Sequence, residues 1–228
     1  MVTAIFPAAG ASKRMGGGMN KNFLELAGEP ILLRTLKTFS QVERVNFLIV
    51  VVAAHEVETV EKLLRGTAGL KSWRVTIGGS ERQYSIANGL KILPDDAEIV
   101  LVHDAARPLI SERTINDVID AAEKFGGAIA AVPAKDTIKI VDAEGFVKFT
   151  PPRSEMAIVQ TPQGFKREIL LRAYDKAAAE KFLGTDDSSL VERLGVKIKI
   201  VMGSYENIKV TTPEDIHVAA TLLRSGDK

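Results

Sequence analysis

The chain has 228 residues, a net charge of +1 and no cysteine. The 30 Lys and Arg residues nearly balance the 29 Asp and Glu residues, so nothing draws the whole protein to nucleic acid or a membrane, and a cationic site must be local. Without cysteine there are no disulfides, thiol chemistry or cysteine-rich metal sites. No apolar run approaches the roughly 18 residues that cross a bilayer, so we expect a cytoplasmic protein.

Short apolar runs alternate with segments of helical periodicity along the chain. This alternation predicts an α/β fold, with a doubly wound, mostly parallel sheet covered by helices on both faces. The predicted strands are residues 2–7, 47–53, 74–77, 99–103, 128–133 and 196–201. The predicted helices are residues 32–41, 56–65, 81–93, 112–124, 166–182, 186–194 and 213–224.

One segment departs from this alternation. Residues 136–142 and 146–150 have period-two patterning around Ala143-Glu144-Gly145, which predicts a β-hairpin, and residues 157–160 are a further extended piece. A hairpin that protrudes from such a domain either mediates dimerisation or packs on its own domain. The pattern leaves both open.

The first predicted strand leads directly into a glycine-rich loop over residues 7–21. Its glycines let the backbone bend tightly and bring N–H groups close to a ligand. No acidic residue occurs before Glu25. The cations of the loop are Lys13, Arg14 and Lys21. We expect this loop to hold a nucleoside triphosphate, and a flexible surface loop with solubilising cations is the alternative.

Two common nucleotide-binding motifs are absent from this loop. A P-loop closes with Gly-Lys-Ser/Thr, and the chain contains no such tripeptide. The dinucleotide fingerprint needs a glycine at position 12, which is Ser12. A nicotinamide-dependent reductase is therefore a weaker alternative, which titration with the cofactor would test.

A second loop lies between a short predicted strand and a helix. Gly78 and Gly79 precede Ser80 and Gln83, which predict a capping box at the helix start. Arg82 and Ser85 follow on one side of the first helical turn, and helix N-termini favour anions. A simple turn before a helix explains the pattern about as well as a ligand site does.

A third loop follows the predicted strand over residues 99–103 and contains Asp104 and Arg107. Ligands of open parallel sheets bind beyond the carboxyl ends of the strands, where both side chains should fall. A carboxylate there can hold Mg²⁺, usually through water, beside substrate phosphates. The alternative is an Asp–Arg pair that stabilises the turn.

Near the C-terminus, Lys209 precedes a predicted helix start at Thr212, Pro213 and Asp215. This lysine is either a phosphate ligand or an ordinary solvated side chain. The histidines, at positions 55, 103 and 217, show no ligand spacing. Neither a histidine-based metal site nor a Ser-His-acid triad can be argued from these positions.

Taken together, the loop motifs occur in a recognisable order. They are Ala8-Ala9-Gly10 with Arg14-Met15-Gly16 and Lys21, Gly78-Gly79 with Arg82 and Ser85, His103-Asp104-Ala105-Ala106-Arg107-Pro108, Asp136-Thr137-Ile138-Lys139, Thr161-Pro162-Gln163 and Asn207-Ile208-Lys209-Val210-Thr211. Over about the whole chain this combination resembles the 2-C-methyl-D-erythritol 4-phosphate cytidylyltransferase family.

The resemblance implies a reaction and an assembly. A cytidylyl group passes from CTP to 2-C-methyl-D-erythritol 4-phosphate, giving 4-diphosphocytidyl-2-C-methyl-D-erythritol and pyrophosphate for isoprenoid precursor synthesis, with Mg²⁺ or another divalent cation. It also implies one nucleotidyltransferase domain over residues 1–228, in which residues 136–160 form a β-arm that exchanges contacts in a homodimer. Neither nucleic acid nor a membrane is an expected partner.

The resemblance also implies roles for single residues. Arg14 and Lys21 match the residues that stabilise the transition state on the triphosphate, and Arg153 and Lys209 match those that position the acceptor phosphate. Asp104 and Arg107 match positions near the metal and the acceptor hydroxyls. Thr137 and Arg153 would reach the partner's site. Positions where the family recognises cytosine are matched by Ala8, Ala9, Gly10, Gly78 and Ser85.

The chain departs from the family pattern around its loop lysine. The usual Pro-Lys-Gln is here Asn20-Lys21-Asn22, and the loop contains the additional run Gly16-Gly17-Gly18. The nearest alternative within the same chemistry is a ribitol-5-phosphate cytidylyltransferase, which shares most of the scaffold. A second alternative is a nucleotide-binding module without turnover.

Overall fold

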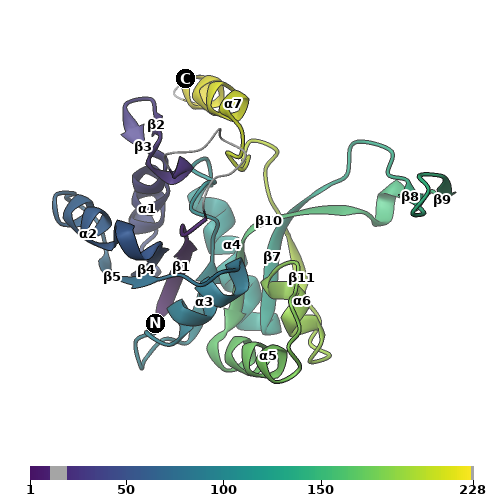
Figure 1. Cartoon of the computed structure of the whole chain (residues 1–228), viewed down its shortest axis with the longest axis horizontal. Helices are drawn as coiled ribbons and strands as arrows, with labels where there is room; N and C mark the ends of the chain where they lie inside the picture. The colour runs from purple at the N-terminus through teal and green to yellow at the C-terminus, as the bar shows by residue number, and fades with distance from the viewer. Residues whose placement is uncertain (11–19, 227–228) are drawn as a thin grey trace.

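The computed structural model describes residues 1–10 and 20–226. Within them, seven strands form one sheet in the order β11-β7-β10-β6-β1-β4-β5 (Figure 1). Neighbouring strands are parallel, except that β10 is antiparallel to both β6 and β7. The strands are β1 (Val2–Pro7), β4 (Val45–Val52), β5 (Ser72–Ile77), β6 (Ile99–Val102), β7 (Gly127–Pro133), β10 (Ala157–Lys166) and β11 (Lys199–Met202).

Helices cover both faces of this sheet, as the alternation in the sequence predicts. The α-helices are α1 (Ile31–Gln41), α2 (Val57–Arg65), α3 (Arg82–Leu90), α4 (Glu112–Phe125), α5 (Arg167–Ala179), α6 (Asp187–Glu192) and α7 (Pro213–Gly226). The 3-10 turns are η2 (Lys21–Phe23), η3 (Ala54–Glu56) and η4 (Arg153–Glu155), and a small hairpin pairs β2 (Glu25–Leu26) with β3 (Glu29–Pro30). In the described part of the chain, no helix is long and apolar enough to span a membrane.

Alternate residues of the strands supply the two halves of the core, because successive side chains in a strand point to opposite faces. Phe6 and Val50 pack on one face with residues of α1, α2 and α4. Ile5 and Val51 pack on the other face with residues of α3, α5 and α6. The continuous Val/Ile/Leu runs of β4 and β6 therefore follow from burial on both faces.

The strand β10 is longer than the sequence predicts. The extended piece predicted at residues 157–160 continues to Lys166 and lies between β6 and β7 in the middle of the sheet. The sequence does not predict the full length of this strand, because Pro162 and Gly164 argue against a central strand. The ladder with β7 is irregular between Val159 and Gln163, which accommodates them.

The predicted hairpin is present and forms an arm that projects from the body of the molecule (Figure 1). Its strands are β8 (Ile140–Val141) and β9 (Val147–Phe149), shorter than the sequence predicts, and Gly145 adopts a positive φ of 89° in the turn. Residues 157–160 belong to β10, which pairs with β7 from the Ala157–Pro133 position onward. The structure thus assigns these residues to the main sheet and not to the hairpin.

Candidate active site

A cavity of about 610 Å³ lies at the carboxyl ends of β1, β5 and β6. The three loops singled out in the sequence meet there, together with the segment before α7. The cavity is lined by Pro7, Ala9, Gly10, Lys21, Asn22, Gly79, Ser80, Glu81, Arg82, Ser85, Asp104, Ala105, Ala106, Lys209 and Thr211. Parallel strands bring their carboxyl ends to one edge, so loops distant in sequence become the walls of one site.

The loops after β1 and β5 touch at a position that only glycine allows. A Cβ atom at Gly78 would lie 2.4 Å from the Cβ of Ala9 and 2.9 Å from Oγ of Ser85. The Ser85 hydroxyl accepts a hydrogen bond from the Gly79 N–H at 3.0 Å and donates to the Glu81 carbonyl at 3.1 Å. Ser85 thereby fixes the glycine turn at the mouth of the cavity.

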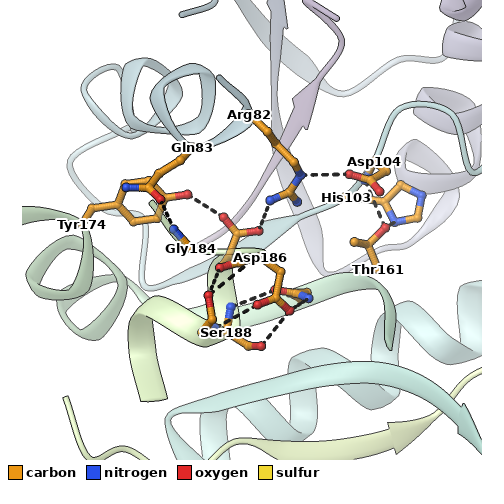
Figure 2. A network of polar contacts seen from close by, with 12 residues as sticks. Arg82, Gln83, His103, Asp104, Thr161, Tyr174, Gly184, Asp186 and Ser188 are labelled. Atoms are coloured by element: carbon orange, nitrogen blue, oxygen red, sulfur yellow. Dashed lines mark hydrogen bonds and ion pairs between the residues drawn. The ribbon is translucent and has the colours of Figure 1, made fainter. Parts of the chain in front are cut away.

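The predicted capping box at the start of α3 is wrong. Glu81, and not Ser80, occupies the N-cap position, and its side chain makes no capping hydrogen bond. The amide oxygen of Gln83 instead accepts from the Gly184 N–H (Figure 2), and its amide nitrogen donates to the Phe182 carbonyl. A long-range tertiary contact replaces the local cap and ties α3 to the segment before α6.

Asp104 lies among cations from three different parts of the chain. Its Oδ1 is 3.2 Å from Nε of Arg82, and its Oδ2 is 2.7 Å from Nζ of Lys209 and 3.8 Å from Nε of Arg107. Burial alone would raise the pKa of Asp104, but the surrounding charges, Arg82 foremost, outweigh it and hold the pKa well below its ordinary value. The carboxylate is therefore ionised and organises the cations around it.

Arg82 joins this cluster to a second, fully buried carboxylate. Its Nη1 lies 2.8 Å from Oδ2 of Asp187, whose side chain is 0% exposed. The hydroxyl of Tyr174 donates to the other oxygen of Asp187 at 2.5 Å, in the network of Figure 2. Burial would lower the pKa of Arg82, but Asp187 and Asp104 raise it, while burial and then the charge of Asp187 raise the pKa of Tyr174.

His103 supports Asp104 from beneath as a neutral ring. Nε2 of His103 donates to the Arg107 carbonyl at 3.1 Å, because a carbonyl oxygen can only accept. In a neutral ring Nδ1 then has no proton and accepts from the Thr161 hydroxyl at 3.1 Å, while Thr161 Oγ1 accepts from the Asp104 N–H at 3.0 Å. Burial lowers the pKa of His103 to about 3, so the ring is a structural hydrogen-bonding group and not an acid–base catalyst near neutral pH.

Comparison with known proteins gives a consistent assignment. The family model for 2-C-methyl-D-erythritol 4-phosphate cytidylyltransferase matches residues 2–225. This chain belongs to that family. The enzyme of this name from Caldanaerobacter subterraneus subsp. tengcongensis is 45% identical over 98% of this chain and 99% of its own length. The Geobacillus thermodenitrificans enzyme is 48% identical over 97% and 96%.

Solved structures of the family share the whole fold. The 4-diphosphocytidyl-2C-methyl-D-erythritol synthase of Anaerococcus prevotii superposes with a TM-score of 0.88 at 36% identity, over 98% of this chain and 96% of that one. The 2-C-methyl-D-erythritol 4-phosphate cytidylyltransferase of Thermus thermophilus gives 0.78 at 31%, over 97% and 98%. The resemblance seen in the sequence motifs is therefore confirmed.

Most of the residues that match the cytidylyltransferase motifs meet at the cavity. Ala9, Gly10, Lys21, Arg82, Ser85, Asp104 and Lys209 line it directly. Ala8 and Gly78 stand next to lining residues, and Arg107 lies behind Asp104, where it donates to the Asn207 carbonyl at 2.7 Å. Arg14 lies outside the described residues.

Two of the matched residues are on the arm segment, away from the cavity of their own chain. Thr137 and Arg153 are exposed, and Arg153 donates to the Lys135 carbonyl at 3.0 Å. Neither is among the residues that line the cavity. Within the described part of one chain, the structure does not bring these two residues to the cytidylyltransferase site.

The expected metal ligand, Asp104, fits poorly as a resident metal site. Both of its oxygens face cations, and among the described residues no group of three or more His, Cys, Asp or Glu side chains could hold a metal. Mg²⁺ needs several oxygen ligands and is usually held by carboxylates together with substrate phosphates. Asp104 and the other residues that the structure describes therefore do not form a site that would hold Mg²⁺ without a substrate phosphate.

The sequence missed Asp187 and Tyr174 as parts of this site. Asp187 follows Asp186, whose side chain caps α6 by accepting from the Ser189 N–H at 2.9 Å. An acid in the first turn of a helix ordinarily offsets the helix dipole, so Asp187 looks like part of the helix start. Nothing local distinguishes it, because its partners Arg82 and Tyr174 come from α3 and α5.

Proposed function

We infer that this protein transfers the cytidylyl group of CTP to 2-C-methyl-D-erythritol 4-phosphate. An oxygen of the acceptor phosphate attacks the α-phosphorus of CTP, and the bond from that phosphorus to the bridging oxygen breaks. Pyrophosphate leaves with the electron pair. The observation that carries this inference is the meeting of the family's loop motifs at one cavity, where Lys21 lines the same wall space as Asp104 and its cation partners Arg82 and Lys209.

The difficulty of this reaction is electrostatic rather than acid–base. Two anions must approach, and negative charge grows on the leaving oxygens. The acceptor phosphate is already nucleophilic, so no general base is needed, in keeping with the neutral, buried His103. Preorganised cations act where charge develops, and one such group is worth about 3–4 kcal/mol in comparable sites.

We assign Lys21, with Arg14, to the triphosphate, and Lys209 to the acceptor phosphate. Lys21 and Lys209 both line the cavity, which supports the assignment. Arg82 and Asp104 then face the acceptor hydroxyls, and Arg107 supports Asp104 from behind. The closely packed loops at Ala8, Ala9, Gly10, Gly78 and Ser85 are suited to cytosine, since their backbone can approach a flat ring.

Magnesium enters this scheme as part of the substrate. We propose that Mg²⁺ arrives on the triphosphate oxygens of CTP, with other divalent cations as substitutes. The compensation of Asp104 by three cations supports this proposal over a metal bound to the protein alone. The ion would neutralise the pyrophosphate leaving group.

The arm supports the proposal of a homodimer. Phe146 is 71% exposed, Phe149 57% and Val147 56%, and a two-stranded hairpin is marginally stable by itself. Exposed apolar patches of this kind mark interaction sites. A second chain that covered the arm could receive Thr137 and Arg153 at its own cavity. We also propose that the enzyme acts in the cytoplasm.

Pyrophosphate release tests the proposed reaction. The protein is incubated with MgCTP and 2-C-methyl-D-erythritol 4-phosphate, then with ribitol 5-phosphate, and each acceptor is repeated with ATP, GTP and UTP. We expect release with CTP and the methylerythritol acceptor far above every other combination. Preference for ribitol 5-phosphate would reassign the acceptor, and CTP binding without release from any acceptor would indicate a nucleotide-binding module.

A further inference from the structure

We propose that Asn20 and Glu56 are positioning residues that hold Lys21 toward the nucleotide. This inference rests on the proposed role of Lys21. The two residues are 36 positions apart, and neither belongs to the cluster around Asp104. They form a polar clamp at the point where the glycine-rich loop rejoins the body.

The clamp uses both ends of the Asn20 side-chain amide. Its Nδ2 donates to Oε1 of Glu56 at 2.9 Å and to the Ala8 carbonyl at 2.7 Å. Its Oδ1 accepts from the backbone N–H of Asn22 at 3.1 Å and from the Asn22 side chain at 3.0 Å. Asn20 thereby caps the 3-10 turn in which Lys21 is the first residue.

Glu56 fixes the clamp to the rigid body. Its carboxylate, in a residue that is 8% exposed, also accepts from the Ala53 N–H at 3.0 Å, so it spans the junction between β4 and α2. Within the described residues, the hydrogen-bond partners of this carboxylate are amide N–H groups rather than cations. Charge-assisted bonds of this type are stronger than neutral ones.

The clamp acts on Lys21 together with a second anchor at the other end of the lysine side chain. Nζ of Lys21 donates to the Val210 carbonyl at 2.7 Å, one residue beyond Lys209. With its backbone held by Asn20 and its ammonium group held by the Val210 carbonyl, Lys21 lines the cavity in a defined conformation. A displacement of about 1 Å in such a group can cost about 100-fold in rate.

A double-mutant cycle tests the clamp. We expect Asn20→Ala to lower kcat by about 10- to 100-fold while the KM for CTP changes little. In a Lys21→Ala background the same substitution should cause no further loss, because it acts through Lys21. The matched control is Asn46→Ala at the opposite end of the sheet, where the side chain accepts from the Val2 N–H and should leave kcat unchanged.

A reversed pair, in which Asn20→Asp and Glu56→Gln exchange the amide and the carboxylate, distinguishes loss of the clamp from misfolding. Asn20→Asp sets two carboxylates against each other and should lower kcat more than Asn20→Ala does. Adding Glu56→Gln lets the new amide donate to the new carboxylate and still accept from Ala53, so kcat should partly recover. The clamp would be overturned if Asn20→Ala lowered kcat equally in the wild-type and Lys21→Ala backgrounds. It would also be overturned if kcat did not recover in the reversed pair. An unimpaired Lys21→Ala enzyme would instead refute the role of Lys21 itself.

Discussion

The charged cluster of Arg82, Asp104, Asp187 and Lys209, here called the floor of the cavity, can be compared with the hairpin arm. The two regions differ in whether their side chains find partners within one chain. At the floor, buried charges face opposite charges, with Asp104 beside Arg82 and Lys209 and with Asp187 fully buried against Arg82. On the arm, aromatic rings point into solvent, and Phe146 is 71% exposed. Burying a charge costs free energy unless an opposite charge pairs with it. An exposed apolar patch marks a surface where another molecule binds. The charges of the floor are compensated within one chain, whereas the exposed apolar rings of the arm are suited to contact with a second chain.

This contrast separates the expected effects of substitutions. Changes at the floor should lower stability as well as activity, because the same contacts hold α3, α5 and α6 to the sheet. Changes on the arm should affect assembly and acceptor binding, and the stability of the body should hardly change.

Asp187→Asn should destabilise the protein by about 3–5 kcal/mol. The substitution keeps the shape of the side chain but leaves Arg82 without its buried counter-charge. Urea unfolding followed by circular dichroism measures the change in the free energy of unfolding. Asp175→Asn on the exposed face of α5 is the control, with an expected change within about 0.5 kcal/mol. A loss below about 1 kcal/mol in Asp187→Asn would show that the floor does not depend on this ion pair.

Arg153→Ala should raise the KM for the acceptor by about 10- to 100-fold, which corresponds to about 1.4–2.7 kcal/mol of binding. The KM for CTP and the free energy of unfolding should stay near their wild-type values, because the side chain is exposed on the arm. Steady-state kinetics with each substrate varied in turn measures the split. Arg172→Ala, exposed on α5, is the matched control. An unchanged acceptor KM would remove Arg153 from its proposed role.

The floor should also lose stability in mild acid through His103. The pKa of this ring is about 3 in the folded protein and 6.5 ordinarily, so between these values the unfolded chain binds a proton that the folded chain excludes. The contribution is complete above pH 6.5 and falls as the pH decreases, by at most about 1.4 kcal/mol per pH unit. Asp104, whose pKa is also lowered, adds to the loss only below its ordinary value of 3.8.

Urea unfolding at about pH 7.5, 6 and 5 measures this slope. His103→Gln should flatten it, whereas His217→Gln, on the exposed face of α7, should leave it unchanged. An equal slope in the His103 variant would assign the acid sensitivity to other groups.

The smallest effect on the body is expected from the arm ring that is most exposed. Phe146→Ser should leave the unfolding free energy of the body within about 0.5 kcal/mol of wild type, yet shift the protein toward a monomer. Sedimentation velocity across a range of protein concentrations measures the shift. A wild-type chain that is already monomeric at all concentrations would contradict the proposed role of the arm.

The sequence predicts the parts of this molecule that depend on local pattern. Strands such as β1 and β4 are continuous apolar runs, and the loops that follow parallel strands must meet at one edge, so Lys21, Arg82 and Asp104 could be predicted to converge. The sequence pattern does not predict the role of a side chain whose partners are distant in the sequence. Gln83 binds the segment before α6 instead of capping α3. Asp187 looks like a helix cap until α3 and α5 bring Arg82 and Tyr174 to it.

Heterodimers of two impaired variants, assayed with the acceptor far below the KM of Arg153→Ala, test the central claim. This claim is that the cavity of one body is completed by the arm of another chain. Lys209→Ala damages only the cavity and Arg153→Ala only the arm, so a mixed dimer isolated through two different affinity tags contains one undamaged site. If the arm acts in the partner, these dimers should regain about half of the wild-type pyrophosphate release. Mixed dimers no more active than the two parent variants would contradict a shared site.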